Sequence, residues 1–271
     1  MIDTDSNASE LRFVLCVVGV MGVTQLHDVV YIVCRESSTI FRFNATTRER
    51  LTDIVVKDLK RPWDIVACEQ TSQLYVADSW DWIWRVSADG ADIKPWLTTS
   101  STGQIYPTSL SVTSTRLLVT SLDTKQLVQL DSRCDELRRV QLPDHMEPWH
   151  AVESPTATFI VSHKNTQLKQ YQISEVNMDG QVLRHFTGSR LSPLGLTEHI
   201  SINSHGNVFV ADNHNGRILL LSAQLKLRRV IIDEHQLNYK EPWRLCYRES
   251  TGQLLVGLFN DRVAVFDVLC R

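Results

Sequence analysis

Three residues of this chain carry side chains suited to metal-assisted or acid–base chemistry: Asp64, His150 and His199. A carboxylate and two imidazoles can ligate a divalent metal and leave coordination positions open for water or a substrate. The three residues are far apart in the sequence. They can act together only if the fold brings them to one place, so the secondary-structure elements that carry them decide what they can do.

The pair Pro-Trp recurs at the start of three short apolar segments, at Pro62-Trp63, Pro148-Trp149 and Pro242-Trp243. The three tryptophans are roughly 90 residues apart, about twice the period of about 40–50 residues that is typical of β-propeller blades. Degenerate copies fill both gaps, at residues 106–112 and 196–202. This spacing predicts a propeller in which each copy begins a blade.

Each repeat also contains a second short, β-rich apolar segment, and no helical periodicity separates the segments. Six such segments occur along the 271 residues, at 30–33, 74–77, 117–120, 159–162, 208–211 and 254–257. Apolar residues make up 43% of the chain, which is enough to build a buried core. We predict an all-β, six-bladed β-propeller in which residues 1–271 form a single domain.

The last repeat reaches the final residue, Arg271, before a fourth strand can form. The apolar segment Leu11–Val18 precedes the first blade and has no role inside it. We predict that this segment is an N-terminal strand that pairs with the outer edge of the last blade. Such pairing removes an open sheet edge and closes the ring.

If the first strand of each blade lines the central channel, the alignment of the repeats places one residue of each blade at an equivalent position. These residues are Gly22, Asp64, Ser109, His150, His199 and Arg244. Asp64, His150 and His199 could then hold a divalent metal at the channel mouth, with Ser109 and Arg244 in the lining. Alternatively, all of them form a hydrogen-bonded polar lining. We favour this second interpretation because the Arg244 guanidinium would oppose a cation.

The segment Val210-Ala211-Asp212-Asn213-His214-Asn215-Gly216-Arg217-Ile218 resembles the NHL repeat, and Tyr75–Ser79 resembles its opening half. The resemblance implies an NHL-like six-bladed propeller. Such a propeller is similar to that of tripartite-motif NHL proteins, in which the propeller recognises protein or RNA targets for a ubiquitin ligase. The Cys/His clusters that a RING or B-box needs to bind zinc are missing from this sequence.

Several loop residues are candidates for contact with a protein partner: Trp80, His163, Asn165, Asn213 and His214. Trp80 is the strongest of them, because a tryptophan in a turn is expected to be exposed and tryptophan is enriched at binding hot spots. Trp82 and Trp84 alternate along a strand and should face a neighbouring blade. The tryptophans of the Pro-Trp pairs could form an exposed rim, but their repeat equivalence favours packing between blades.

Composition and motifs narrow the functional classes. The net charge of −3 disfavours nucleic acid as a partner, and the most apolar stretch, Leu11–Val23, is too short to span a membrane. Phosphate-binding loops and nucleophile elbows are missing. Six scattered cysteines predict reduced thiols and a cytoplasmic location. We expect a monomeric, non-enzymatic interaction scaffold without a cofactor. The alternatives are a metal-dependent hydrolase or lyase at the channel mouth and, more weakly, an RNA-binding protein.

Overall fold

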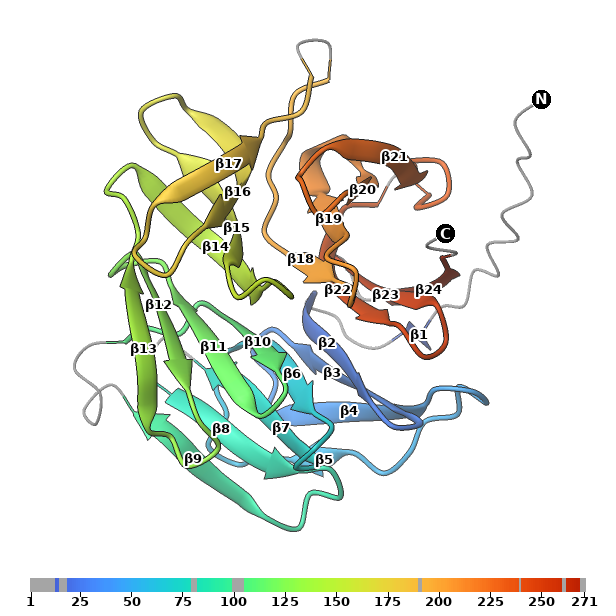
Figure 1. Ribbon diagram of the computed structural model, residues 1–271. Coiled ribbons are helices and arrows are strands. Elements are labelled where there is room, and N and C mark those ends of the chain that lie inside the picture. The colour runs from blue at the N-terminus through green and yellow to red at the C-terminus, as the bar shows by residue number, and fades with distance from the viewer. Residues whose placement is uncertain are drawn as a thin grey trace.

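Six four-stranded antiparallel sheets surround a central axis in the computed structural model, and no α-helix occurs among its described residues (Figure 1). The structure describes residues 13–14, 19–78, 82–98, 105–189, 192–238, 240–259 and 262–268. Each sheet is one blade, and in five of the six the four strands follow one another in chain order outward from the axis, whereas in the last blade the outermost strand comes from the N-terminal part of the chain. The prediction of an all-β, six-bladed propeller is therefore confirmed.

The first three blades are built from consecutive strands. Blade 1 contains β2 (Val20–Leu26), β3 (Val29–Cys34), β4 (Thr39–Asn44) and β5 (Ile54–Val55). Blade 2 contains β6 (Pro62–Cys68), β7 (Gln73–Asp78), β8 (Trp82–Ser87) and β9 (Ile93–Thr98). Blade 3 contains β10 (Ser109–Thr113), β11 (Arg116–Ser121), β12 (Gln126–Leu130) and β13 (Glu136–Gln141).

The other three blades repeat this order. Blade 4 contains β14 (Met146–Glu153), β15 (Phe159–Asn165), β16 (Gln170–Val176) and β17 (Val182–Phe186). Blade 5 contains β18 (Ile200–Ile202), β19 (Val208–Asp212), β20 (Arg217–Leu221) and β21 (Leu227–Ile232), with a 3₁₀ turn at Asn213–Asn215. Blade 6 contains β22 (Pro242–Arg248), β23 (Gln253–Leu258) and β24 (Arg262–Asp267). All six predicted second segments lie in β3, β7, β11, β15, β19 and β23.

The outer strand of blade 6 comes from the N-terminal part of the chain. β1 (Phe13–Val14) pairs antiparallel with β24, with Phe13 opposite Val263. The predicted closure by an N-terminal strand is confirmed for these two residues, and the rest of the predicted segment 11–18 lies outside the described residues. This pairing gives the last blade its fourth strand and covers an edge that would otherwise expose unpaired backbone groups.

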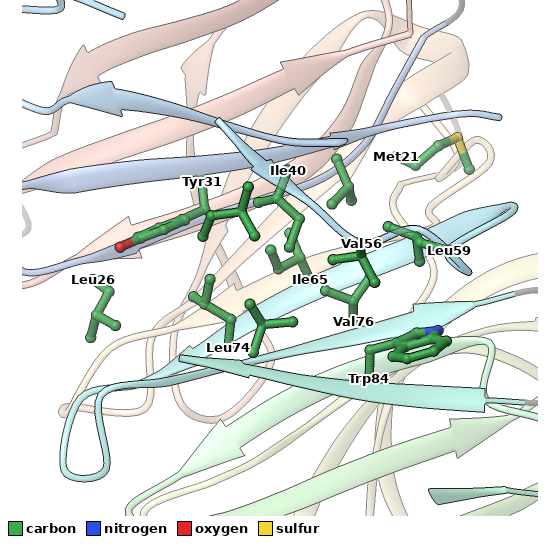
Figure 2. Packing of buried hydrophobic residues seen from close by; sticks show 13 residues of the cluster. Met21, Leu26, Tyr31, Ile40, Val56, Leu59, Ile65, Leu74, Val76 and Trp84 are labelled. Carbon is green, nitrogen blue, oxygen red and sulfur yellow. The ribbon is translucent and has the colours of Figure 1, made fainter. Parts of the chain in front are cut away.

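The core lies between the blades, because each blade packs its apolar face on the next. Figure 2 shows the cluster between blades 1 and 2, where Val56 and Leu59 lie near Trp84. Trp63 contacts both this cluster and the one between blades 2 and 3, and Trp243 packs against Phe259 with ring centroids 4.9 Å apart. The Trp63 contacts favour packing between blades for this Pro-Trp pair, whereas the Trp243 contact lies within blade 6.

The cysteines differ from the expectation at one position. Cys68, Cys134 and Cys246 are free, and burial raises the pKa of the Cys134 thiol to about 11. Cys34, however, takes part in a disulfide, so the prediction of reduced thiols is wrong for this residue. Cysteine count and spacing do not reveal which thiols the fold brings together, because pairing depends on the distance between Cα atoms.

In the part of the chain that the structure describes, no helix has the length and apolar character needed to cross a membrane.

Candidate functional site

A β-bulge recurs in the first strand of four blades and orients the residue that follows it. The pairing register skips one residue after Val20, Pro62, Pro148 and Pro242. A bulge bends its strand and redirects the next side chain. As a result Gly22, Asp64, His150 and Arg244 lie opposite corresponding residues of the second strands, which are Val33, Ala77, Ser162 and Gly257.

The remaining two blades reach the same register without a bulge. Ser109 pairs with Thr120, and the backbone carbonyl of His199 accepts a hydrogen bond from Ala211 N–H at 3.2 Å. One residue of each blade therefore occupies an equivalent position, and we call this set the axial ring. It consists of Gly22, Asp64, Ser109, His150, His199 and Arg244. The alignment of the repeats had grouped the same six residues.

Asp64, His150 and His199 lie together and are buried, with exposed fractions of 1%, 2% and 6%. The two imidazole rings stack with centroids 3.8 Å apart and an interplanar angle of 25°. His199 Nε2 is 3.9 Å from Asp64 Oδ2. One potential ligand atom from each residue can be chosen so that all three lie within 4.8 Å of one another.

These side chains form hydrogen bonds with the backbone of neighbouring blades. Asp64 Oδ2 accepts the N–H of Leu110 and Oδ1 accepts that of Ile65, both at 2.9 Å. His150 Nε2 lies 3.1 Å from the carbonyl of Leu110, to which it donates, and His150 Nδ1 accepts the N–H of Ile200 at 3.4 Å. Blade 2 is thereby linked to blade 3, and blade 4 to both blade 3 and blade 5.

His199 and Arg244 continue the same pattern around the axis. His199 Nδ1 accepts the N–H of Leu245 at 3.3 Å, which links blade 5 to blade 6. The Arg244 guanidinium donates to the carbonyls of Met21 at 2.6 Å, Trp243 at 3.1 Å and Trp63 at 3.2 Å. This one side chain thus joins blade 6 to blades 1 and 2.

Burial dominates the electrostatics of the axial ring. Desolvation lowers the pKa of both His150 and His199 well below the ordinary value, and the Arg244 charge lowers that of His199 further. Desolvation raises the pKa of Asp64, and Arg244 partly opposes this shift. Glu198, 3.7 Å from Arg244, also has a pKa raised by burial. Both imidazoles are therefore neutral at neutral pH.

The donor set fits a structural role better than a metal site. Both nitrogens of His150 and Nδ1 of His199 already bond to backbone groups, so ligation through these atoms would leave buried backbone groups unpaired. Each unsatisfied buried group costs about 1–3 kcal/mol. In addition, the guanidinium of Arg244, a member of the same ring, carries a positive charge that would oppose a cation. The observed hydrogen bonds thus agree with a polar lining.

Elemental mass spectrometry tests this interpretation directly. We expect purified wild-type protein to contain less than stoichiometric zinc, manganese or magnesium, and no more than a His150→Ala/His199→Ala variant. The two preparations should be compared after identical dialysis without chelator. Stoichiometric metal in wild type that disappears in the variant would contradict the polar-lining interpretation and would support the hydrolase or lyase alternative.

Gly22 is the member of the axial ring that has no room for a side chain. A Cβ at this position would lie 2.7 Å from the backbone nitrogen of Ile65 and 3.0 Å from Val33 Cγ2. Gly22→Ala should therefore destabilise the protein by about 1–3 kcal/mol through overpacking. Ser109→Ala is the matched control at the equivalent position of blade 3. It should be nearly neutral, since the buried Ser109 Oγ makes no hydrogen bond with the described residues. Equal urea-unfolding midpoints for the two variants would contradict this view.

Most of the residues predicted to contact a partner are buried or lie outside the described chain. His163 and Asn213 are each 1% exposed, and His163 Nε2 is 2.8 Å from Ser174 Oγ. The side chain of Asn165 accepts the N–H groups of Gln167 and Leu168, at 3.1 and 3.0 Å. His214 is exposed, and Trp80 lies outside the described residues. Partner binding through His163, Asn165 or Asn213 would require these internal positions to open.

The structure contains a surface feature that the sequence analysis did not find. A groove of about 680 Å³ runs between the outer part of blade 1 and blade 2. Its walls include Val55, Trp82 and Pro95, and Lys57 and Lys60 also line it. Trp82 is 39% exposed and stacks on the buried Trp84, with centroids 6.0 Å apart. Strand alternation correctly placed these two tryptophans on one face, but only Trp84 is covered by blade 1.

The fold and the axial ring define the class of this protein as a six-bladed β-propeller. Among solved structures, it is similar to virginiamycin B lyase from Staphylococcus aureus, with 11% identity, a TM-score of 0.68, and coverage of 96% of this chain and 99% of the other. It is also similar to the WD40 β-propeller domain of Doa1, with 16% identity, a TM-score of 0.66, and coverage of 98% and 97%. At these identities the likeness shows the fold alone.

A third solved structure is also similar, whereas the comparisons of sequence found no match. Hydrazine synthase of Kuenenia stuttgartiensis matches over 100% of both chains with 10% identity and a TM-score of 0.66. No family model matches the sequence, and no curated protein matches it. The likeness to the NHL repeat therefore remains a resemblance carried by Asp212 and its turn. There the Asp212 carboxylate accepts hydrogen bonds from Gly195 N–H, the Asn215 amide and the Arg217 guanidinium.

Proposed function

We propose that this propeller is a non-enzymatic interaction scaffold that binds a protein partner in the groove between blades 1 and 2. The observation that carries the proposal is the exposed aromatic and aliphatic surface in that groove, with Trp82 39% and Val55 57% exposed. The axial ring supports a non-enzymatic role, because Asp64 Oδ2, His150 Nδ1 and His199 Nδ1 accept hydrogen bonds from the backbone of neighbouring blades.

Trp82 has the features of a binding hot spot. Its indole is held on one side by Trp84, so a partner that covers the other side would bury a large apolar area with little loss of side-chain entropy. Hot-spot tryptophans typically contribute about 2 kcal/mol or more to binding. The similarity to tripartite-motif NHL propellers extends the proposal to target recognition in ubiquitin-ligase-type assemblies, with any ligase activity supplied by another protein.

Trp82→Ala should abolish partner capture and leave the fold intact. Immobilised wild type and variant would be incubated with the same cell extract, and captured proteins would be quantified by mass spectrometry. We expect at least one protein to be enriched on wild type and reduced about 30-fold or more on Trp82→Ala, as a loss of about 2 kcal/mol implies. Leu183→Ala, which truncates a side chain of 50% exposure on β17, should retain it. An identical set of captured proteins on all three baits would overturn the proposal.

A second candidate is a metal-dependent hydrolase or lyase that uses the mouth of the central channel. The observation in its favour is the proximity of Asp64, His150 and His199, next to a channel space of about 370 Å³ lined by the first strands of all six blades. One of the similar solved structures is a virginiamycin B lyase with quinupristin. The metal analysis described above separates this candidate from the scaffold.

A further inference from the structure

The groove between blades 1 and 2 has a one-sided distribution of exposed charge. Lys57, Lys60 and Arg61, all exposed, lie in the segment that joins β5 to β6, where Asp58 is the one exposed acid. Lys57, Asp58 and Lys60 line the groove itself. Within the described residues, none of the three cations makes an ion pair. Exposed cations without a partner are usually solvated, but here they flank an apolar surface.

The carboxylate of Asp78 holds this segment in place without offering its charge to a ligand. It accepts the N–H of Arg61 at 2.7 Å, the N–H of Lys60 at 3.2 Å and the indole N–H of Trp84 at 3.2 Å. Asp78 is only 2% exposed. Because these donors occupy the carboxylate, the negative charge at the base of the groove is satisfied internally. The backbone of Lys60 and Arg61 is fixed, and their side chains extend from a preorganised surface.

Apolar residues form much of the lining of the groove, beside Lys57, Asp58, Lys60 and Asp78. Val56, Leu59 and Trp84 belong to the buried cluster between blades 1 and 2, and Figure 2 shows them close together at its edge. Above this base, Val55 and Trp82 present exposed apolar surface. A volume of about 680 Å³ lies within the range of about 300–1,000 Å³ that is usual for ligand sites. Such a site suits a large apolar side chain flanked by groups that can reach the lysines.

We infer that the occupant of the groove is a short acidic segment of the partner protein, with a large aliphatic or aromatic residue between aspartates or glutamates. This inference rests on the proposed function and specifies the partner's chemistry. The apolar residue would pack on Trp82 and Val55, and the acids would pair with Lys57, Lys60 and Arg61. A protein segment is favoured over RNA because the groove is lined by aliphatic residues, including Ile93 and Pro95, and the chain carries a net charge of −3.

A displayed random-peptide library selected on the folded full chain tests the inference. We expect the enriched peptides to combine Leu, Phe or Trp with an excess of Asp and Glu. Fluorescence anisotropy of an enriched peptide should show at least a tenfold weaker affinity for Lys57→Glu/Lys60→Glu. Lys226→Glu/Arg228→Glu, an equal charge reversal at exposed positions of blade 5, should bind within about twofold of wild type. Thermal unfolding of each variant verifies that it is folded.

The outcomes distinguish this inference from the proposed function. Neutral or basic peptides that bind in a Trp82-dependent manner would overturn the acidic occupant and leave a protein-binding groove. An acidic peptide whose affinity is insensitive to Lys57→Glu/Lys60→Glu would also overturn the acidic occupant. Peptides whose binding does not depend on Trp82 would overturn both. A fluorescent single-stranded RNA that binds wild type through Lys57 and Lys60, with no peptide enriched, would overturn the inference in favour of RNA.

Discussion

Replacement of Arg244 by methionine should lower the free energy of unfolding by about 3–5 kcal/mol, the range found when one partner of a buried ionic network is removed. The Arg244 guanidinium is 4% exposed and bonds to three backbone carbonyls in blades 1, 2 and 6. Methionine fills similar space but leaves those carbonyls and Glu198 without their donor. Urea unfolding followed by tryptophan fluorescence would measure the change.

Arg133→Met is a suitable control for this experiment. The Arg133 side chain is 80% exposed and pairs with Asp131 at 3.4 Å. Exposed ion pairs contribute between about 0 and 1 kcal/mol, so the control should remain close to wild type. If Arg244→Met and Arg133→Met shifted stability equally, the hydrogen bonds of Arg244 would not stabilise the ring.

The stability of the protein should fall as the pH drops below about 6.5, the usual pKa of histidine in an unfolded chain. Burial lowers the folded-state pKa of His150 and His199 well below this value, and lowers that of His163 to about 4. The unfolded state then binds more protons than the folded state, so protonation favours unfolding. For each buried histidine the loss approaches about 1.4 kcal/mol per pH unit until its folded-state pKa is reached.

Urea unfolding between about pH 7.5 and 5 would measure this dependence. His150→Gln/His199→Gln should reduce the slope, because glutamine can accept a backbone hydrogen bond but does not titrate in this range. Asp64, whose pKa is raised, acts in the opposite direction, and its presence in both proteins leaves the comparison valid. His205→Gln, at a side chain of 78% exposure, serves as the surface control for the substitution. An unchanged slope in the double variant would contradict neutral imidazoles in the axial ring.

The arrangement of blades and the axial ring could be predicted because both depend on local repeats. Short apolar strands and Pro-Trp pairs mark each blade, and the bulge after Pro62, Pro148 and Pro242 fixes the next residue at an equivalent position. Residues that align between the sequence repeats therefore occupy equivalent positions in the blades. Even Ser109 and His199, which lie in degenerate repeats, were placed with the others.

Exposure in the loops and between the blades could not be predicted in the same way. The sequence predicts a loop at His163, but β15 continues to Asn165 and buries His163. Trp82 and Trp84 are equivalent by alternation, and only the position of blade 1 decides that the first is exposed and the second covered. The groove forms where the segment between β5 and β6 passes the outer strands of blade 2, a proximity that no repeat pattern encodes.

The chemical diversity of the axial ring specifies the order of the blades. Asp64 matches the N–H of Leu110, His150 matches the carbonyl of Leu110 and the N–H of Ile200, and Gly22 leaves space beside Ile65. If a blade occupied another place in the ring, a hydrogen-bond donor would face another donor, or a Cβ would clash with the backbone of the neighbouring blade. The degenerate repeats thus make adjacent blades non-interchangeable, which limits mispairing between similar sequences during folding.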